Sequence, residues 1–103
     1  MKITVELFMN MQEDDGLTLK NYRSVTYKSG YQVALCGCEC RTPEEAVEAV
    51  NQYGGSCGIW YSKGIYYIDE SIRVDTKTAA LAIGKHCNQI SILQWKDFKL
   101  VYC

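Results

Sequence analysis

The feature that most constrains the fold is a helix start signal at residues 42–45, Thr-Pro-Glu-Glu. Threonine is a favoured N-cap, proline suits the first helical position, and a glutamate three residues after the cap closes a capping box. Gly54-Gly55 ends a helical pattern whose apolar face is formed by Ala46, Ala49, Val50 and Tyr53. The sequence therefore predicts an amphipathic helix that begins at Pro43.

A second helix is expected at residues 77–87, "KTAALAIGKHC", with Asp75 or Thr76 as its cap and a left-handed Asn88 at its end. Each expected helix precedes two strands joined by a turn. These hairpins are residues 57–74 and 90–103. A shift of 33 residues aligns the two helix-hairpin segments, with Thr42 opposite Asp75 at the caps. The match indicates either a tandem duplication or two amphipathic units that share only a general pattern.

The N-terminal region is predicted to be β structure. Apolar residues alternate with the period of a half-buried strand at Ile3, Val5, Leu7 and Met9. Residues 10–19 contain a Glu-Asp-Asp-Gly cluster and are predicted to form an exposed, mobile loop. Residues 22–40 are predicted to form a hairpin that turns at Ser29-Gly30.

These elements predict one α+β domain over residues 1–103, an antiparallel sheet with two helices on one face. Its parts are a β region at 1–41, a first αββ unit at 42–74 and a second αββ unit at 75–103. The 48% of apolar residues suits a single core, and the net charge of −1 offers no general attraction for nucleic acid or anionic lipid. Neither a signal peptide nor a membrane span is recognisable, so the expected location is the cytoplasm.

Three of the six cysteines, Cys36, Cys38 and Cys40, alternate along one expected strand and therefore share a face. Free thiols are expected in a reducing cytoplasm, and small apolar thiols suit close packing beneath a helix. Same-face neighbours on a strand lie ~6.6 to 7 Å apart, whereas structural zinc usually takes cysteine pairs from tight turns. The prediction is packing without a bound metal, and a metal site at these cysteines is the alternative.

Catalytic residues and cofactors are not predicted. The chain has one histidine and lacks the nucleophile, zinc and phosphate-loop motifs of the common enzyme classes. Four of its twelve aromatic residues instead cluster around one hairpin, at Trp60, Tyr61, Tyr66 and Tyr67. Tyrosine and tryptophan supply large, rigid contact areas at protein interfaces, so this hairpin is predicted to bind a protein.

Strand alternation over residues 65–74 places Tyr66, Ile68, Ile72 and Val74 on one side. The other side carries Tyr67, Asp69, Ser71 and Arg73. This second row offers a ring, a carboxylate, a hydroxyl and a guanidinium, which suit a peptide or nucleotide, but a solvated strand face has the same composition. The predicted partner-binding residues are Trp60, Tyr61, Tyr66, Tyr67, Asp69 and Arg73.

The stretch "GIWYSKGIYYIDESIRVDTKTAALAIGKHCNQISI", residues 58–92, resembles small and mostly uncharacterised proteins of phages and mobile elements of gut bacteria. The shared features are a Trp before a short turn, a Tyr-x-x-Asp-x-Ser strand, an Ala-Leu-rich helix and Asn-Gln before the last strand. This resemblance implies a small accessory protein that acts stoichiometrically on host machinery, as anti-CRISPR and other anti-defence inhibitors do.

The leading hypothesis is therefore a non-enzymatic protein that binds a host protein, for example a defence nuclease, without contacting nucleic acid or membrane directly. A second hypothesis is a module that binds a nucleotide or signalling molecule through aromatic stacking and Arg73. A third is a regulator that binds a metal through its cysteines. The oligomeric state and the identity of the partner are left open.

Overall fold

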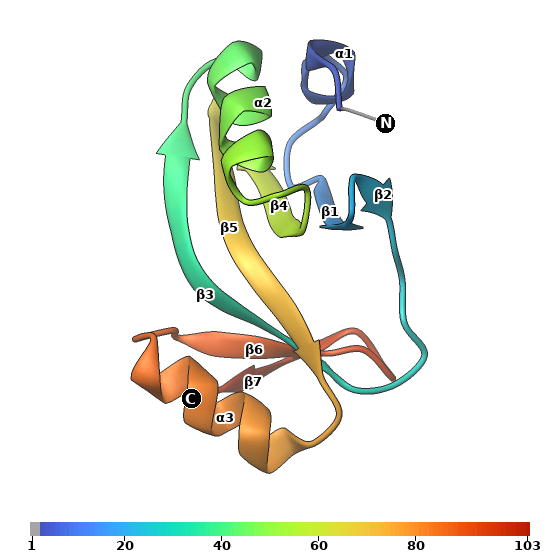
Figure 1. Ribbon diagram of the computed structural model, residues 1–103, viewed down its shortest axis with the longest axis vertical. Coiled ribbons are helices and arrows are strands. Elements are labelled where there is room, and N and C mark those ends of the chain that lie inside the picture. The colour runs from blue at the N-terminus through green and yellow to red at the C-terminus, as the bar shows by residue number, and fades with distance from the viewer. Residues whose placement is uncertain (1–2) are drawn as a thin grey trace. The chain divides into compact units, whose positions relative to one another are not determined.

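The computed structural model describes residues 3–103, which form three helices and an antiparallel sheet of seven strands (Figure 1). The α+β class predicted from the sequence is confirmed. In chain order the elements are α1 (Val5–Met9), β1 (Gly16–Lys20), β2 (Arg23–Ser24), β3 (Tyr31–Cys40), α2 (Pro43–Gln52), β4 (Cys57–Ser62), β5 (Ile65–Val74), α3 (Lys77–His86), β6 (Ser91–Gln94) and β7 (Lys99–Tyr102). The strand order is β2-β1-β4-β5-β3-β6-β7.

The chain divides into two units, and each is described separately. Unit 1 comprises Met1–Val25 and Gly37–Glu70, and unit 2 comprises Thr26–Cys36 and Ser71–Cys103. The two longest strands, β3 and β5, contribute residues to both units. Unit 1 contains α1 and α2, whereas unit 2 contains α3.

Helix α2 of unit 1 begins as its sequence signal predicts. The backbone N–H of Glu45 donates to the Thr42 hydroxyl at 3.2 Å, and the Glu45 carboxylate accepts from the Thr42 backbone N–H at 3.2 Å. These reciprocal bonds satisfy two amides that the helix itself leaves without partners. At the other end Gly54 and Gly55 both have positive φ, and Gly55 N–H donates to the Val50 carbonyl. Both predicted ends of the helix are confirmed.

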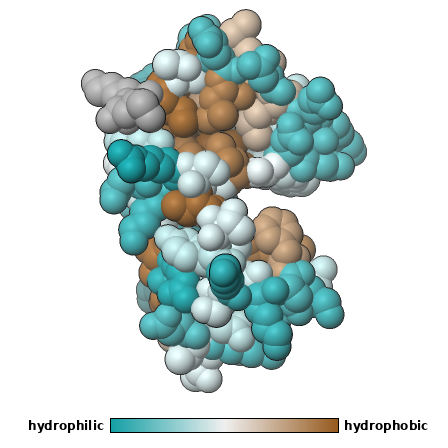
Figure 2. Space-filling view, turned by 90° about the vertical axis from the view of Figure 1, so that its right-hand side faces the viewer, coloured by the Kyte–Doolittle hydropathy of each residue, from teal (hydrophilic) through white to brown (hydrophobic). Residues whose placement is uncertain are grey.

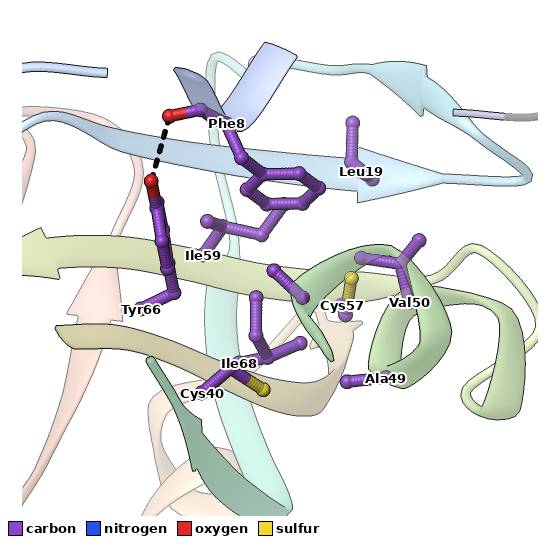
Figure 3. Packing of buried hydrophobic residues seen from close by; sticks show 10 residues of the cluster. Phe8, Leu19, Cys40, Ala49, Val50, Cys57, Ile59, Tyr66 and Ile68 are labelled. Atoms are coloured by element: carbon purple, nitrogen blue, oxygen red, sulfur yellow. Dashed lines mark hydrogen bonds between the residues drawn. The ribbon is translucent and has the colours of Figure 1, made fainter. Parts of the chain in front are cut away.

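The core of unit 1 lies between α2 and one face of the sheet (Figure 3). Phe8 and Ile68 are fully or almost fully buried, and the Phe8 ring meets the Tyr66 ring edge-on at 5.4 Å. The Tyr66 hydroxyl donates to the Phe8 carbonyl at 2.9 Å, so its polar end is satisfied inside the core. The other core members drawn with them include Leu19, Cys40, Ala49, Val50, Cys57 and Ile59.

The predicted N-terminal strand is wrong, because residues 5–9 form helix α1. Alternation placed Phe8 on the outer side of a strand, but the structure buries Phe8 completely and leaves Met9 66% exposed. The helix brings Phe8 into contact with Tyr66, which is far along the chain. In a segment this short, the spacing of apolar residues alone cannot distinguish a helix from a strand. Leu7 and Met11 are partly buried and pack against the core of unit 1. Figure 2 shows hydrophobic side chains in the upper part of the view.

The segment predicted as a mobile loop is also different in the structure. Its last four residues belong to strand β1, which pairs with β4 through Leu17 and Ile59. The earlier part is tied to the β4–β5 turn, because Glu13 accepts hydrogen bonds at 2.8 Å from the Ser62 hydroxyl and from the Lys63 backbone N–H. These two donors lower the pKa of the Glu13 carboxyl, with the Lys63 backbone N–H as the larger cause.

The predicted hairpin over residues 22–40 is wrong as well. Strand β2 has only two residues and pairs with β1, whereas β3 lies between β5 and β6. The chain turns at Asn21 and Tyr22, which both have positive φ, as a tight two-residue hairpin turn requires. Tyrosine rarely adopts a positive φ. The Tyr22 ring packs against Gly55 so closely that a Cβ on Gly55 would stand only 2.5 Å from it. Tertiary packing against a glycine thus stabilises a turn that the local sequence does not announce.

In unit 2, helix α3 packs Ala80 against Val33 and Ile92. Its N-cap is Thr76, whose hydroxyl accepts from the Ala79 backbone N–H at 3.2 Å, and Asn88 after the helix has the predicted positive φ. Asp75, the other candidate cap, instead pairs with Arg73.

Helix α2 precedes the β4–β5 hairpin, and helix α3 precedes the β6–β7 hairpin. The two N-caps, Thr42 and Thr76, lie 34 residues apart, so the predicted pairing of Thr42 with Asp75 is wrong by one position. The buried strand residues Ile59 and Ile92 do match at a shift of 33. The helices and the strands therefore follow different shifts, and duplication stays a prediction.

Candidate functional site

The alternation of β4 and β5 separates a core face from a face turned away from α2. Ile59 and Ile68 form one directly opposed pair and point into the core of unit 1. The neighbouring pairs are Trp60 with Tyr67 and Gly58 with Asp69, which lie on the opposite face because successive strand residues alternate. A two-residue turn at Lys63-Gly64, both with positive φ, sets this register.

Trp60 and Tyr67 form a stacked aromatic pair. Their ring centroids are 5.0 Å apart with an interplanar angle of 27°, and Trp60 is 44% exposed. On the other side of Trp60 the cross-strand partner is Gly16 of β1, which has no side chain to cover the indole. The pair is therefore a partly exposed aromatic surface on the sheet.

Asp69 lies beside this pair in a space that two glycines provide. A Cβ at Gly58 would stand 2.8 Å from Asp69 Oδ1, and a Cβ at Gly37 would stand 3.0 Å from Asp69 Cβ. The first distance is too short for a real side chain, and at Gly37 a Cβ would also stand 2.9 Å from the Ile68 carbonyl oxygen, so a larger residue at either position would force a local shift. We call the carboxylate and its two glycines the Asp69 cradle.

Burial raises the pKa of the Asp69 carboxyl to about 6 from its ordinary 3.8, against the lowering effect of a hydrogen bond from the Gly58 backbone. No ion pair within residues 3–103 involves Asp69. At neutral pH the group is therefore ionised, partly buried and without a cation from the described chain. Such an arrangement costs stability, and perturbed carboxyls of this kind concentrate at functional sites.

The other predicted contact residues have different surroundings. Tyr66 is buried in the core, and its ring lies 4.7 Å from that of half-buried Tyr61, so neither adds to the Trp60–Tyr67 surface. Arg73 belongs to unit 2, where Nη1 lies 2.7 Å from Asp75 Oδ1 and the guanidinium carbon lies 5.1 Å from the Tyr27 ring centroid. The structure thus brings together Trp60, Tyr67 and Asp69 of the predicted set.

The alternation predicted for β5 fails after Glu70. Ile72, expected on the apolar side, is 38% exposed, whereas Ser71 is buried. The Ser71 hydroxyl accepts from Gln32 Nε2 at 3.0 Å, and Gln32 Oε1 accepts from the Trp95 indole N–H at 3.1 Å. This hydrogen-bond chain in unit 2 explains how a serine can replace an apolar residue in the interior.

None of the six cysteines, all within residues 3–103, forms a disulfide, and their exposure differs. Cys40 and Cys57 are buried, and burial raises the pKa of each thiol to about 12. Cys36 and Cys38 are exposed, so the packing prediction holds for one of the three cysteines in the run. Cys38 Sγ lies 3.9 Å from Cys40 Sγ, but the described residues contain no group of three or more side chains able to hold a metal ion.

Two features of the surface were not predicted from the sequence. One is the Asp69 cradle, whose signal was a glycine at each cross-strand neighbour of an acidic strand residue. The other is a set of exposed apolar side chains around the β6–β7 hairpin, where β7 is an edge strand. Its members are Ile90, Phe98, Leu100 and Tyr102, each between 59% and 80% exposed.

No protein-family model, curated protein or solved structure matches the chain, so its function is inferred from its residues and their geometry. Within residues 3–103, no helix combines the length and the apolar character that crossing a membrane requires.

Proposed function

We propose that the protein acts stoichiometrically, as a module that binds another protein through the face formed by Trp60, Tyr67 and Asp69. The observation that carries the proposal is the stacked, partly exposed aromatic pair beside a carboxylate that forms no ion pair with residues 3–103. Tryptophan and tyrosine dominate binding energy at protein interfaces because they bury a large area with few rotatable bonds. The resemblance over residues 58–92 supports a phage-type accessory protein with a host protein as the partner.

The charge of this face favours a protein over a nucleotide or a nucleic acid. Bases could stack on Trp60 and Tyr67, but the phosphates that follow them would meet the Asp69 carboxylate. Arg73, the expected phosphate contact, already pairs with Asp75 and lies over the Tyr27 ring. A metal-dependent role for the cysteines has less support, because the two buried thiols resist the deprotonation that metal binding needs.

The finer features of the fold belong to the same proposal. We propose that residues 42–74 and 75–103 are tandem αββ units whose helices cover one face of the sheet, in a protein of the bacterial cytoplasm. The succession of helix and hairpin in each segment supports this arrangement. It would leave the opposite face of the sheet for binding, in keeping with the outward position of Trp60 and Tyr67.

Affinity capture from a bacterial lysate with matched variants tests the proposed function. Wild-type protein, Trp60→Ala, Tyr67→Ala and the control Phe98→Ala are immobilised at equal density, and bound proteins are quantified by mass spectrometry. Phe98 is a suitable control because it is an exposed ring of unit 2. We expect wild type and Phe98→Ala to capture the same lysate protein. Trp60→Ala and Tyr67→Ala should fail to capture it. Equal recovery by all four proteins, or no recovery, would contradict the proposal.

A further inference from the structure

We propose that the Asp69 cradle and the Trp60–Tyr67 pair together form a receptor site for an arginine side chain of the partner protein. The inference deepens the proposed function and rests on it. It assigns a ligand chemistry to the face: a guanidinium that stacks on the aromatic pair and donates hydrogen bonds to the Asp69 carboxylate.

Unit 2 contains a complete example of this chemistry. There the Arg73 guanidinium lies over the Tyr27 ring, with 5.1 Å between its carbon and the ring centroid, and Nη1 donates to Asp75 Oδ1 at 2.7 Å. Nε of the same side chain donates to the Ser29 carbonyl at 3.1 Å. An arginine is thus held by one ring and one carboxylate at the same time, as cation–π and charge-assisted hydrogen bonds allow.

Unit 1 contains the same two acceptors without the arginine. The Trp60–Tyr67 pair and the Gly58–Asp69 pair are consecutive same-face pairs of one hairpin, about 7 Å apart along the strands. A cation is attracted to a ring from as far as about 6 Å, so a guanidinium between the pairs reaches both acceptors. Glycine at position 58 leaves room for the Asp69 carboxylate to lie over β4, with Oδ1 2.8 Å from the place where a Cβ would stand.

Arginine fits this site better than other side chains. Its planar fork can donate two hydrogen bonds to one carboxylate while its face lies on an aromatic ring, which the compact ammonium of lysine cannot do. A cation also supplies the countercharge that Asp69 lacks among residues 3–103, so pairing offsets the cost of keeping this carboxylate ionised.

A titration with N-acetyl-arginine amide, followed by heteronuclear NMR at pH 8, tests the site directly. We expect weak, saturable shifts at the Trp60 indole N–H and at the Gly58 and Asp69 amides. The Trp95 indole, whose N–H is bonded to Gln32, serves as an internal reference that stays unshifted. The absence of a saturable shift at Trp60 would overturn the inference.

Matched ligands and variants test whether binding depends on the charge of the ligand or only on its shape. N-acetyl-citrulline amide has nearly the same shape but no charge, and we expect it to bind at least about tenfold more weakly. Asp69→Asn should weaken arginine binding to the same extent, whereas the control Asp75→Asn should leave it unchanged. Equal binding of citrulline, or unchanged binding by Asp69→Asn, would contradict a cation site.

The pH dependence of arginine binding provides a further test. Because the pKa of Asp69 is about 6, the Asp69 carboxyl is protonated in most of the free protein at pH 5. This carboxyl must lose its proton when the arginine binds. Arginine affinity should therefore fall about tenfold between pH 8 and pH 5 in wild type, and not in Asp69→Asn. A pH-independent affinity would contradict the role of this carboxylate.

The two proposals fail separately. If a lysate protein is lost by Trp60→Ala but retained by Asp69→Asn, the binding face is real and the arginine site is wrong. If the arginine titration succeeds while no lysate protein depends on Trp60, the receptor site is real and the proposed function is wrong.

Discussion

Asp69 of unit 1 and Asp75 of unit 2 are six positions apart in the sequence, and each has an aromatic ring nearby in its own unit. Asp75 is paired with Arg73 at 2.7 Å, and its side chain is 83% exposed. Asp69 is partly buried, has no ion pair within residues 3–103, and has its pKa raised by burial. Asp75, which is exposed to water and needs a cation least, is paired with one. Asp69, whose burial makes its charge more costly, forms no ion pair with residues 3–103. The proposed arginine site would account for this difference, because a cation of the partner would supply the charge that Asp69 lacks among residues 3–103.

The largest expected effect comes from filling the cradle. Gly58→Ala should lower the free energy of unfolding by about 1–3 kcal/mol, because the new Cβ would stand 2.8 Å from Asp69 Oδ1 and would push the carboxylate away from its hydrogen bond with the Gly58 backbone. Chemical denaturation measures the change. Gly16→Ala, on the neighbouring strand, is the matched control, since its Cβ would make only an ordinary 3.6 Å contact with the Ile59 carbonyl.

A double variant sharpens this prediction. In an Asp69→Ala background the carboxylate is absent, so Gly58→Ala should then cost much less than in wild type. If the cost is the same in both backgrounds, the glycine is needed for a reason other than Asp69.

Neutralising Asp69 should stabilise the protein at pH 8, by roughly 1–2 kcal/mol. The folded-state pKa of about 6 lies above the ordinary 3.8, so the folded protein holds this proton more tightly than the unfolded chain does. The contribution of this group to stability is therefore full below about pH 4 and is lost as the pH rises towards 6.

Denaturation curves between pH 4 and pH 8 measure this effect in wild type and in Asp69→Asn. We expect the loss of stability with rising pH to be smaller in the variant. A variant that is less stable than wild type at pH 8 would show that the ionised carboxylate is satisfied by the protein after all.

The smallest effect is expected for the paired carboxylate. Asp75→Asn should lower the free energy of unfolding by less than about 1 kcal/mol, because an exposed ion pair contributes little in water. The same denaturation curves test it, and added salt should reduce the difference further. A loss well above this value, or a gain like that expected for Asp69→Asn, would remove the contrast between the two carboxylates.

Local signals in the sequence were enough to predict the helices and hairpins that follow residue 42. The capping pattern at Thr42 and the left-handed Asn88 act within a few residues, so their effect can be read without knowing the fold. Strand alternation also placed Tyr67 and Asp69 on the same side of their strand, because the side-chain period of a strand is local too.

The parts that the sequence did not reveal depend on contacts between distant residues. The carbonyl of Phe8, in helix α1, accepts a hydrogen bond from Tyr66. The turn at Tyr22 depends on the space at Gly55. Ser71 can be buried because Gln32 forms a hydrogen bond with its hydroxyl. The Asp69 cradle is of the same kind, since it needs glycines from β3 and β4 to lie beside one residue of β5. Sequence by itself determined where α2 starts and ends and on which side of β5 Tyr67 and Asp69 lie. Only the tertiary structure decided which side chains meet and which charge is left without a partner, because burial and pairing arise between strands that are far apart in the chain.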